Sequence, residues 1–109
     1  MSLQGIAEIR RVDRIEELVI GRDTYRIEVL RCTQATALEP AFQRETFTAC
    51  AYKRMDIEVR PAGSPGAAPV TASVWVRFPL QEVRDDALED RVLELARCAL
   101  VEEVGRRAG

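Results

Sequence analysis

Histidine, the side chain that most often serves as a general base, is absent from this sequence. A serine or cysteine nucleophile therefore lacks its usual partner. Carboxylates do occur in adjacent pairs, at residues 16–17, 85–86 and 102–103. Neighbouring side chains diverge on a helix or a strand, so these pairs indicate helix caps and solvated positions rather than the acid and base of a hydrolase.

The three cysteines, Cys32, Cys50 and Cys98, are an odd number at wide spacings and form no C-x-x-C motif. This pattern argues against structural disulfides and against a zinc site. We expect Cys98 in the middle of a helix and Cys50 in the middle of a strand, where nothing lowers the pKa of a thiol. The sequence predicts no metal, no cofactor and no catalytic residue, and it favours a protein that is not an enzyme.

Charge and hydropathy argue against nucleic acid and membranes as partners. The chain has 16 basic and 18 acidic residues, interspersed along its length, for a net charge of −2. Arginine far outnumbers the single lysine, Lys53, which is typical of GC-rich bacterial codon usage. No apolar run approaches the roughly twenty residues that span a bilayer, and the first residues do not resemble a signal peptide. We expect a bacterial, cytoplasmic protein with a single domain over residues 1–109.

Two hairpins account for most of the predicted sheet. Residues 53–60 and 70–80 alternate apolar and polar side chains on either side of a Pro/Gly-rich break at 61–69. Residues 15–20 and 25–29 flank a turn at Gly21-Arg22-Asp23. Residues 6–12 are interpreted as a further short strand, although Asp13 and Glu16 could instead open one helical turn. Residues 33–45 have no stable period and are predicted to form a long loop.

From Asp85 the period changes to that of an amphipathic helix, capped by Asp85 or Asp86 and ended by Gly105. Its predicted apolar face consists of Leu88, Val92, Leu95, Ala96, Ala99, Leu100 and Val104. The fold class that follows is α+β. We expect an antiparallel β-meander of four to five strands with the C-terminal helix packed on one face.

The sheet face opposite the helix is predicted to be too apolar to be left exposed to solvent. Trp75 and Tyr52 lie on it, and such side chains favour interfaces because they combine large area with a polar tip. Either another part of the chain folds over this face or a partner covers it. The predicted interface residues are Trp75, Tyr52, Arg54, Cys50, Leu30 and Arg77.

Strand register decides which side chains meet on that face. We expect Arg54 opposite Trp75, because the alternative sets Arg54 directly opposite Arg77. The parity of Lys53 points it toward the helix-covered face, where an unpaired ammonium is costly. We therefore predict either a bulge near residues 52–54 that turns it outward, or an extended side chain at the rim that reaches Glu89 or Glu103.

The leading functional hypothesis is a non-catalytic interaction or assembly protein, acting as a homo-oligomeric accessory subunit, most simply a dimer, with another protein as a further partner. It rests on the lack of catalytic residues together with an interface-like face. Self-association would use that face, with Trp75 and Tyr52, or an edge of the sheet. The alternative is a small-ligand-binding protein or minor enzyme with a pocket between the sheet and the loop at residues 33–45. In that alternative Tyr25, Arg44, Lys53 or Arg54 would contact an anionic ligand.

Overall fold

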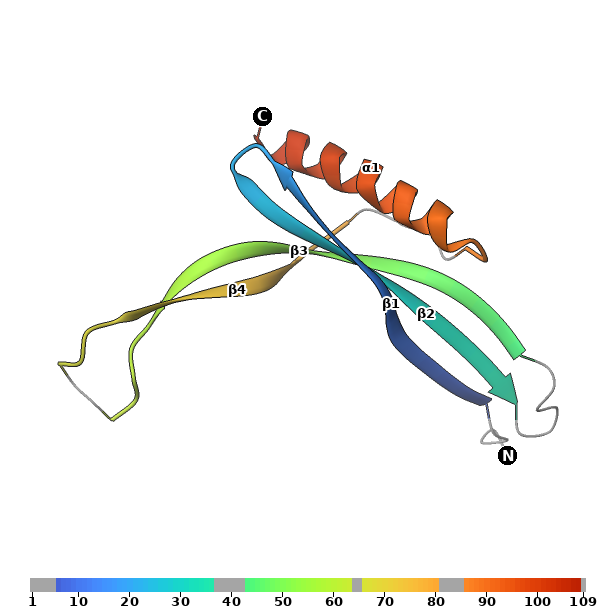
Figure 1. The fold of residues 1–109 in the computed structure, drawn as a ribbon, viewed down its shortest axis with the longest axis horizontal. Helices are drawn as coiled ribbons and strands as arrows, with labels where there is room; N and C mark the ends of the chain where they lie inside the picture. Colours follow the sequence, from blue (N-terminus) through green and yellow to red (C-terminus); the bar gives the residue numbers. More distant parts are fainter. Residues whose placement is uncertain (1–5, 37–42, 64–65, 81–85, 109) are drawn as a thin grey trace.

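The computed structural model describes residues 6–36, 43–63, 66–80 and 86–108. Its four strands form one antiparallel sheet in the order β1-β2-β3-β4, and one helix, α1, packs on the sheet (Figure 1). The elements are β1 (Ile6–Ile20), β2 (Asp23–Thr36), β3 (Gln43–Val59), β4 (Val70–Phe78) and α1 (Glu89–Ala108). The predicted α+β meander with a C-terminal helix is confirmed.

Residues 6–20 form one continuous strand rather than a short strand followed by another element. The turn at Gly21, which has a φ of 65°, connects β1 to β2 as predicted. The register between these strands shifts between Val12 and Arg14, so Asp13 is an extra residue in β1. Such a bulge changes the face to which the following side chains point. It explains why the sequence around residues 12–19 does not alternate cleanly.

The strands β2 and β3 are longer than predicted. Residues 33–36 and 43–45, assigned to a loop from the sequence, extend these two strands and pair with each other, while residues 37–42 lie outside the described residues. The predicted bulge near residues 52–54 is wrong, because β3 pairs with both neighbours there without a register shift. The predicted register is confirmed, with Arg54 opposite Trp75 and Ala51 opposite Phe78.

Helix α1 begins at Glu89, directly after a short link to the sheet. Asp86 exchanges two backbone hydrogen bonds with Phe47, at 2.8 and 3.1 Å, and its carboxylate accepts a hydrogen bond from the Leu88 amide at 3.0 Å. Asp85, the other predicted cap, lies outside the described residues. The predicted end at Gly105 is wrong, because the helix continues through it to Ala108.

The core lies between α1 and the middle of the sheet. Val92, Leu93, Ala96 and Leu100 are the buried residues of the helix. They pack against Tyr25, Ile27 and Val29 of β2, Phe47 and Ala51 of β3, and Phe78 of β4. Leu88 and Leu95 were assigned to this face from the sequence, but they are 60% and 45% exposed. The buried stripe is rotated toward Leu93, because 92, 93, 96 and 100 are the positions that follow one side of the helix.

The helix covers only part of the sheet. The outer half of the β3–β4 hairpin, residues 53–59 and 70–76, extends away from the helix and is here called the arm (Figure 1). It contributes to a maximum dimension of 60 Å, which is long for 109 residues. The arm is a two-stranded ribbon, and an isolated ribbon of this kind is marginally stable in water.

Candidate functional site

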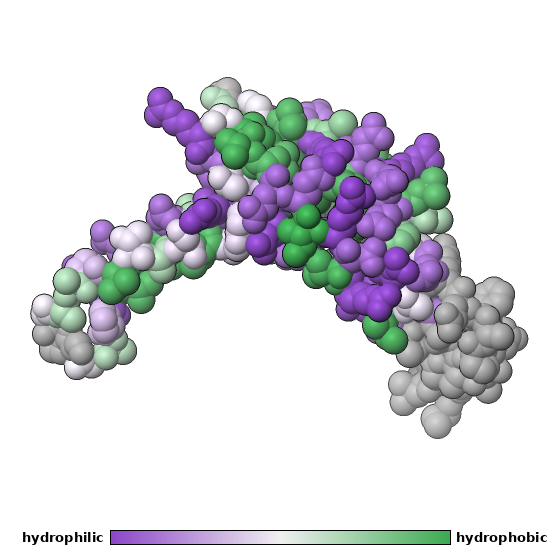
Figure 2. Space-filling view, in the orientation of Figure 1, coloured by the Kyte–Doolittle hydropathy of each residue, from purple (hydrophilic) through white to green (hydrophobic). Residues whose placement is uncertain are grey.

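The arm is amphipathic. The face that continues the helix-covered side of the sheet carries only apolar side chains beyond Lys53, and five of them are 41% to 58% exposed: Met55, Ile57, Val59, Val70 and Val76. The row is completed by Val74, opposite Met55, and Ala72, opposite Ile57, which are both half-buried. We call these seven residues the arm stripe. In Figure 2 hydrophobic side chains are visible on the surface of the arm.

Beyond Trp75, which lies opposite Arg54 at the base of the arm, the other face of the arm is polar and internally bonded. Ser73 donates a hydrogen bond to Asp56 at 2.6 Å and accepts one from Arg54 at 3.3 Å. Glu58 and Thr71 form the next cross-strand pair and are exposed. This face is suited to water, so the arm stripe is the side of the ribbon that lacks a cover in a single chain.

The six predicted interface residues all lie on the sheet face opposite α1, as their register pairs require. Arginines cover both aromatic side chains of this set. The Arg26 guanidinium lies 4.5 Å from the Trp75 ring centre, and that of Arg77 lies 5.8 Å from the Tyr52 ring centre. Cys50 is buried, with its sulfur 3.6 Å from the Tyr52 hydroxyl, and this contact is the main cause that raises the pKa of Tyr52.

Sequence reasoning missed Arg26, which holds this face together. The Arg26 side chain is about one quarter exposed, and its guanidinium lies within 3.7 Å of the carboxylates of Glu17 and Glu28 while it stacks on Trp75. The half-burial of Trp75 is thus accounted for within one chain. The pairing of β2 with β3 places Arg26 beside Tyr52, and Trp75 lies one strand further along the same face.

We expect the substitution Arg26→Gln to lower the free energy of unfolding by about 1 kcal/mol, the size of a partly exposed cation–π contact. Trp75 is the only tryptophan, so its fluorescence reports the change directly. The emission maximum should move to longer wavelength as water replaces the guanidinium. Arg22→Gln, which removes an exposed arginine in the β1–β2 turn, is the control and should leave both the spectrum and the urea midpoint unchanged. An unchanged Trp75 spectrum in Arg26→Gln would contradict the stacked arrangement.

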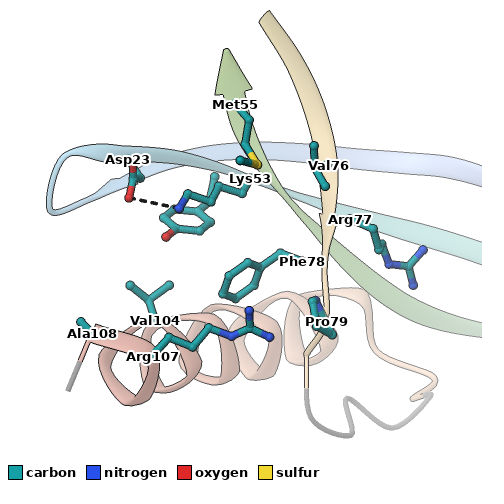
Figure 3. Close-up of a pocket in the computed structure, with 11 residues that line it drawn as sticks. Asp23, Lys53, Met55, Val76, Arg77, Phe78, Pro79, Val104, Arg107 and Ala108 are labelled. Carbon is teal, nitrogen blue, oxygen red and sulfur yellow. Dashed lines mark ion pairs between the residues drawn. The ribbon is translucent and has the colours of Figure 1, made fainter. Parts of the chain in front are cut away.

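Two of the predicted ligand-contacting residues do lie together. Tyr25 and Lys53 line a pocket of about 390 Å³ between the base of the arm and the C-terminal end of α1 (Figure 3). Its apolar wall includes Met55, Phe78 and Val104. This pocket is not beside residues 33–45, where the sequence had placed one, because it lies at the start of β2 and residues 33–36 form the opposite end of that strand.

Arg54 and Arg44 are not part of this pocket. Arg54 lies on the opposite sheet face, and the side chain of Arg44 lies outside the described residues. Lys53 is at the rim as predicted, one third exposed, but its acidic partner is Asp23, with Nζ and Oδ2 3.5 Å apart. Glu103, one of the two predicted partners, instead accepts hydrogen bonds from Arg106 and Arg107.

Charged groups connect α1 to β1 at the far side of the core. Arg97 pairs with Glu16 and Arg14 with Asp90, the latter at 2.8 Å. Nearby, a hydrogen bond from Arg31 lowers the pKa of the Asp13 carboxyl. Burial is the main cause that raises the pKa of Glu89, and a hydrogen bond with Asp13 adds to it. These contacts join the helix to the sheet by ion pairs, so we interpret them as structural.

No group of three or more acidic or cysteine side chains in the described part of the chain is placed to hold a metal ion. Of the helical residues that the structure describes, none form a segment both long and apolar enough to cross a membrane. Comparison with protein-family models, with curated proteins and with solved structures yields no match.

Proposed function

We propose that this chain is a non-catalytic interaction protein that forms a homodimer, in which the arm stripes of two copies pack face to face. The observation that carries the proposal is the arm stripe, an exposed apolar row on a projecting two-stranded ribbon whose other face is polar beyond Trp75. We assign it to the cytoplasm of a bacterium, where it would serve as an accessory or assembly subunit.

A second copy is the occupant that best fits the stripe. The stripe has no charged side chain to select a different partner by charge, and an apolar face is complementary to itself across a twofold axis. A partner's arm would form a layer about as thick as α1, because two sheets pack about 10 Å apart and a helix has a diameter of about 10–12 Å. The partner's arm would therefore continue the layer that α1 begins, and both halves of the sheet would then be covered.

The expected dimer is weak. Burying the exposed half of an aliphatic side chain is worth about 1 kcal/mol, so five in each copy contribute about 10 kcal/mol. Association costs about 4–15 kcal/mol in lost freedom of motion. At the lower end of that cost about 6 kcal/mol remains, which corresponds to a dissociation constant of tens of micromolar.

Sedimentation equilibrium over a dilution series tests the proposal. The mass should rise from 12.2 kDa at low concentration toward 24.4 kDa, twice that value, as concentration increases. A mass of one chain at all concentrations up to the millimolar range would contradict it.

A further inference from the structure

The pocket at the base of the arm combines two arm-stripe residues, Met55 and Val76, with aromatic and charged groups that lie outside the arm stripe. It is built from a single chain, by β2, β3, β4 and α1, and its volume of about 390 Å³ lies in the range of small-molecule sites. Figure 3 shows Lys53 entering from the strand side, Val104 and Arg107 from the helix side, and Phe78 between them. An apolar wall with a few converging polar groups is the usual form of such a site.

The apolar wall is preorganised. The rings of Tyr25 and Phe78 meet edge to face, with centres 5.3 Å apart and an interplanar angle of 78°. Both side chains are almost fully buried, so their positions are determined by the core rather than by a ligand. Met55 and Val104 lie beside them, and a methionine adapts readily to the shape of an apolar ligand.

Two cations border this wall. The Arg107 guanidinium lies 4.7 Å from the Phe78 ring centre and donates its Nε hydrogen to Glu103 at 3.0 Å. Lys53 is held by Asp23 at 3.5 Å, which is longer than a normal hydrogen bond between charged groups. An ammonium has three donors, so Lys53 can bind a further acceptor without leaving Asp23.

We propose that this pocket binds a small amphipathic carboxylate, whose apolar body lies against Phe78 and Met55 and whose carboxylate pairs with the cations Lys53 and Arg107. An inorganic anion would gain nothing from the apolar wall, and a neutral apolar molecule would gain nothing from the cations. Selectivity for a molecule that has both features is therefore the property to test.

Octanoate, titrated below its micelle concentration and followed by ¹H–¹⁵N NMR, is the probe. We expect saturable shifts at the amides of Tyr25, Lys53 and Val104, and at least tenfold weaker binding of 1-octanol. Inorganic phosphate should leave these amides unshifted. Equal affinity for octanoate and 1-octanol, or octanoate shifts that fall elsewhere on the sheet, would overturn the assignment.

Lys53→Met should weaken the binding of octanoate at least tenfold and leave the affinity for 1-octanol unchanged. Arg54→Met is the matched control, since it removes a positive charge from the next residue, which points to the other face, and octanoate should then bind as in the wild type. Arg107→Met is a second variant, in an exposed position at the helix end, and should also weaken octanoate. Full octanoate affinity in both Lys53→Met and Arg107→Met would refute the proposal.

Every lining residue of the pocket belongs to one chain, but Met55 and Val76 also belong to the arm stripe, so the proposed dimer would restrict access to the pocket. The variant Val74→Lys, which should prevent dimer formation, is expected to bind octanoate at least as tightly as the wild type, because Val74 does not line the pocket and a partner no longer covers Met55. Loss of octanoate binding in that variant would overturn the assignment of the pocket to a single chain, and the oligomeric state is measured separately.

Discussion

The substitution Val74→Lys is expected to keep the protein at the mass of one chain, 12.2 kDa, at concentrations where the wild type is a dimer. Val74 lies in the arm stripe opposite Met55 and is half-buried in the single chain, so a lysine there can extend to water without disturbing the fold. In the dimer the same ammonium would be buried against an apolar face, together with its symmetry mate. We expect dimerisation to weaken at least a hundredfold, about 3 kcal/mol.

Thr71→Lys is the matched control for this experiment. It adds the same charge to the same strand, on the exposed polar face of the arm, and should leave the dimer intact. A dimer that tolerates Val74→Lys but not Thr71→Lys would place the interface on the opposite sheet face, where Trp75 lies. Pairing of two β4 edges is a third arrangement, and it would protect alternate β4 amides from hydrogen exchange in a way that face-to-face packing does not.

The strand pairs of the second hairpin could be predicted from the sequence because one physical preference dominates there. Alternation in residues 53–60 and 70–80 defines two faces, and like charges avoid direct opposition, which leaves Arg54 opposite Trp75. Residues 12–19 offered no such pattern, because the extra residue Asp13 changes the face of the side chains around it. Bulges of this kind depend on the partner strand as much as on the bulged one.

The extent of helix coverage could not be predicted from alternation. Met55 and Ile57 have the same parity as the buried Ala51, yet they are exposed because α1 packs on the middle of the sheet and leaves the arm largely uncovered. A pattern of period two identifies which side chains share a face, but it does not say how much of that face another element covers. The sequence therefore directed attention to the face of Trp75, while the uncovered apolar surface of the arm lies on the other side.

The pocket, too, could be predicted from the sequence only in part. Tyr25 and Lys53 are opposite one another in the pairing of β2 with β3, and Asp23 lies on the same face two residues from Tyr25. The acidic partner of Lys53 thus comes from a neighbouring strand whose register with β3 the sequence does not determine. Arg107, near the end of the helix, carries no local signal beyond a charge suited to a helix C-terminus, so its contact with Phe78 depended on tertiary structure.

Helix α1 provides the sharpest test of the core, because two leucines two residues apart differ in burial. Leu93 is 2% exposed and packs against the sheet, whereas Leu95 is 45% exposed on the opposite side of the helix. Leu93→Ala should lower the free energy of unfolding by about 2–5 kcal/mol, through lost apolar burial and the cavity left behind. This is a large fraction of the roughly 5–15 kcal/mol that stabilises a typical domain.

Leu95→Ala is the control in this pair, and it should change the free energy of unfolding by less than about 1 kcal/mol, because alanine favours the helix and little burial is lost. Urea denaturation followed by circular dichroism measures the free energy of unfolding of both variants. If its slope against urea concentration is unchanged, the loss of stability arises in the native state. If the helix were instead rotated so that the face predicted from the sequence was buried, Leu95 would lie in the core and Leu93 would be exposed. A larger loss for Leu95→Ala than for Leu93→Ala would therefore disprove the orientation of α1, and with it the wall of the pocket that Val104 and Arg107 form.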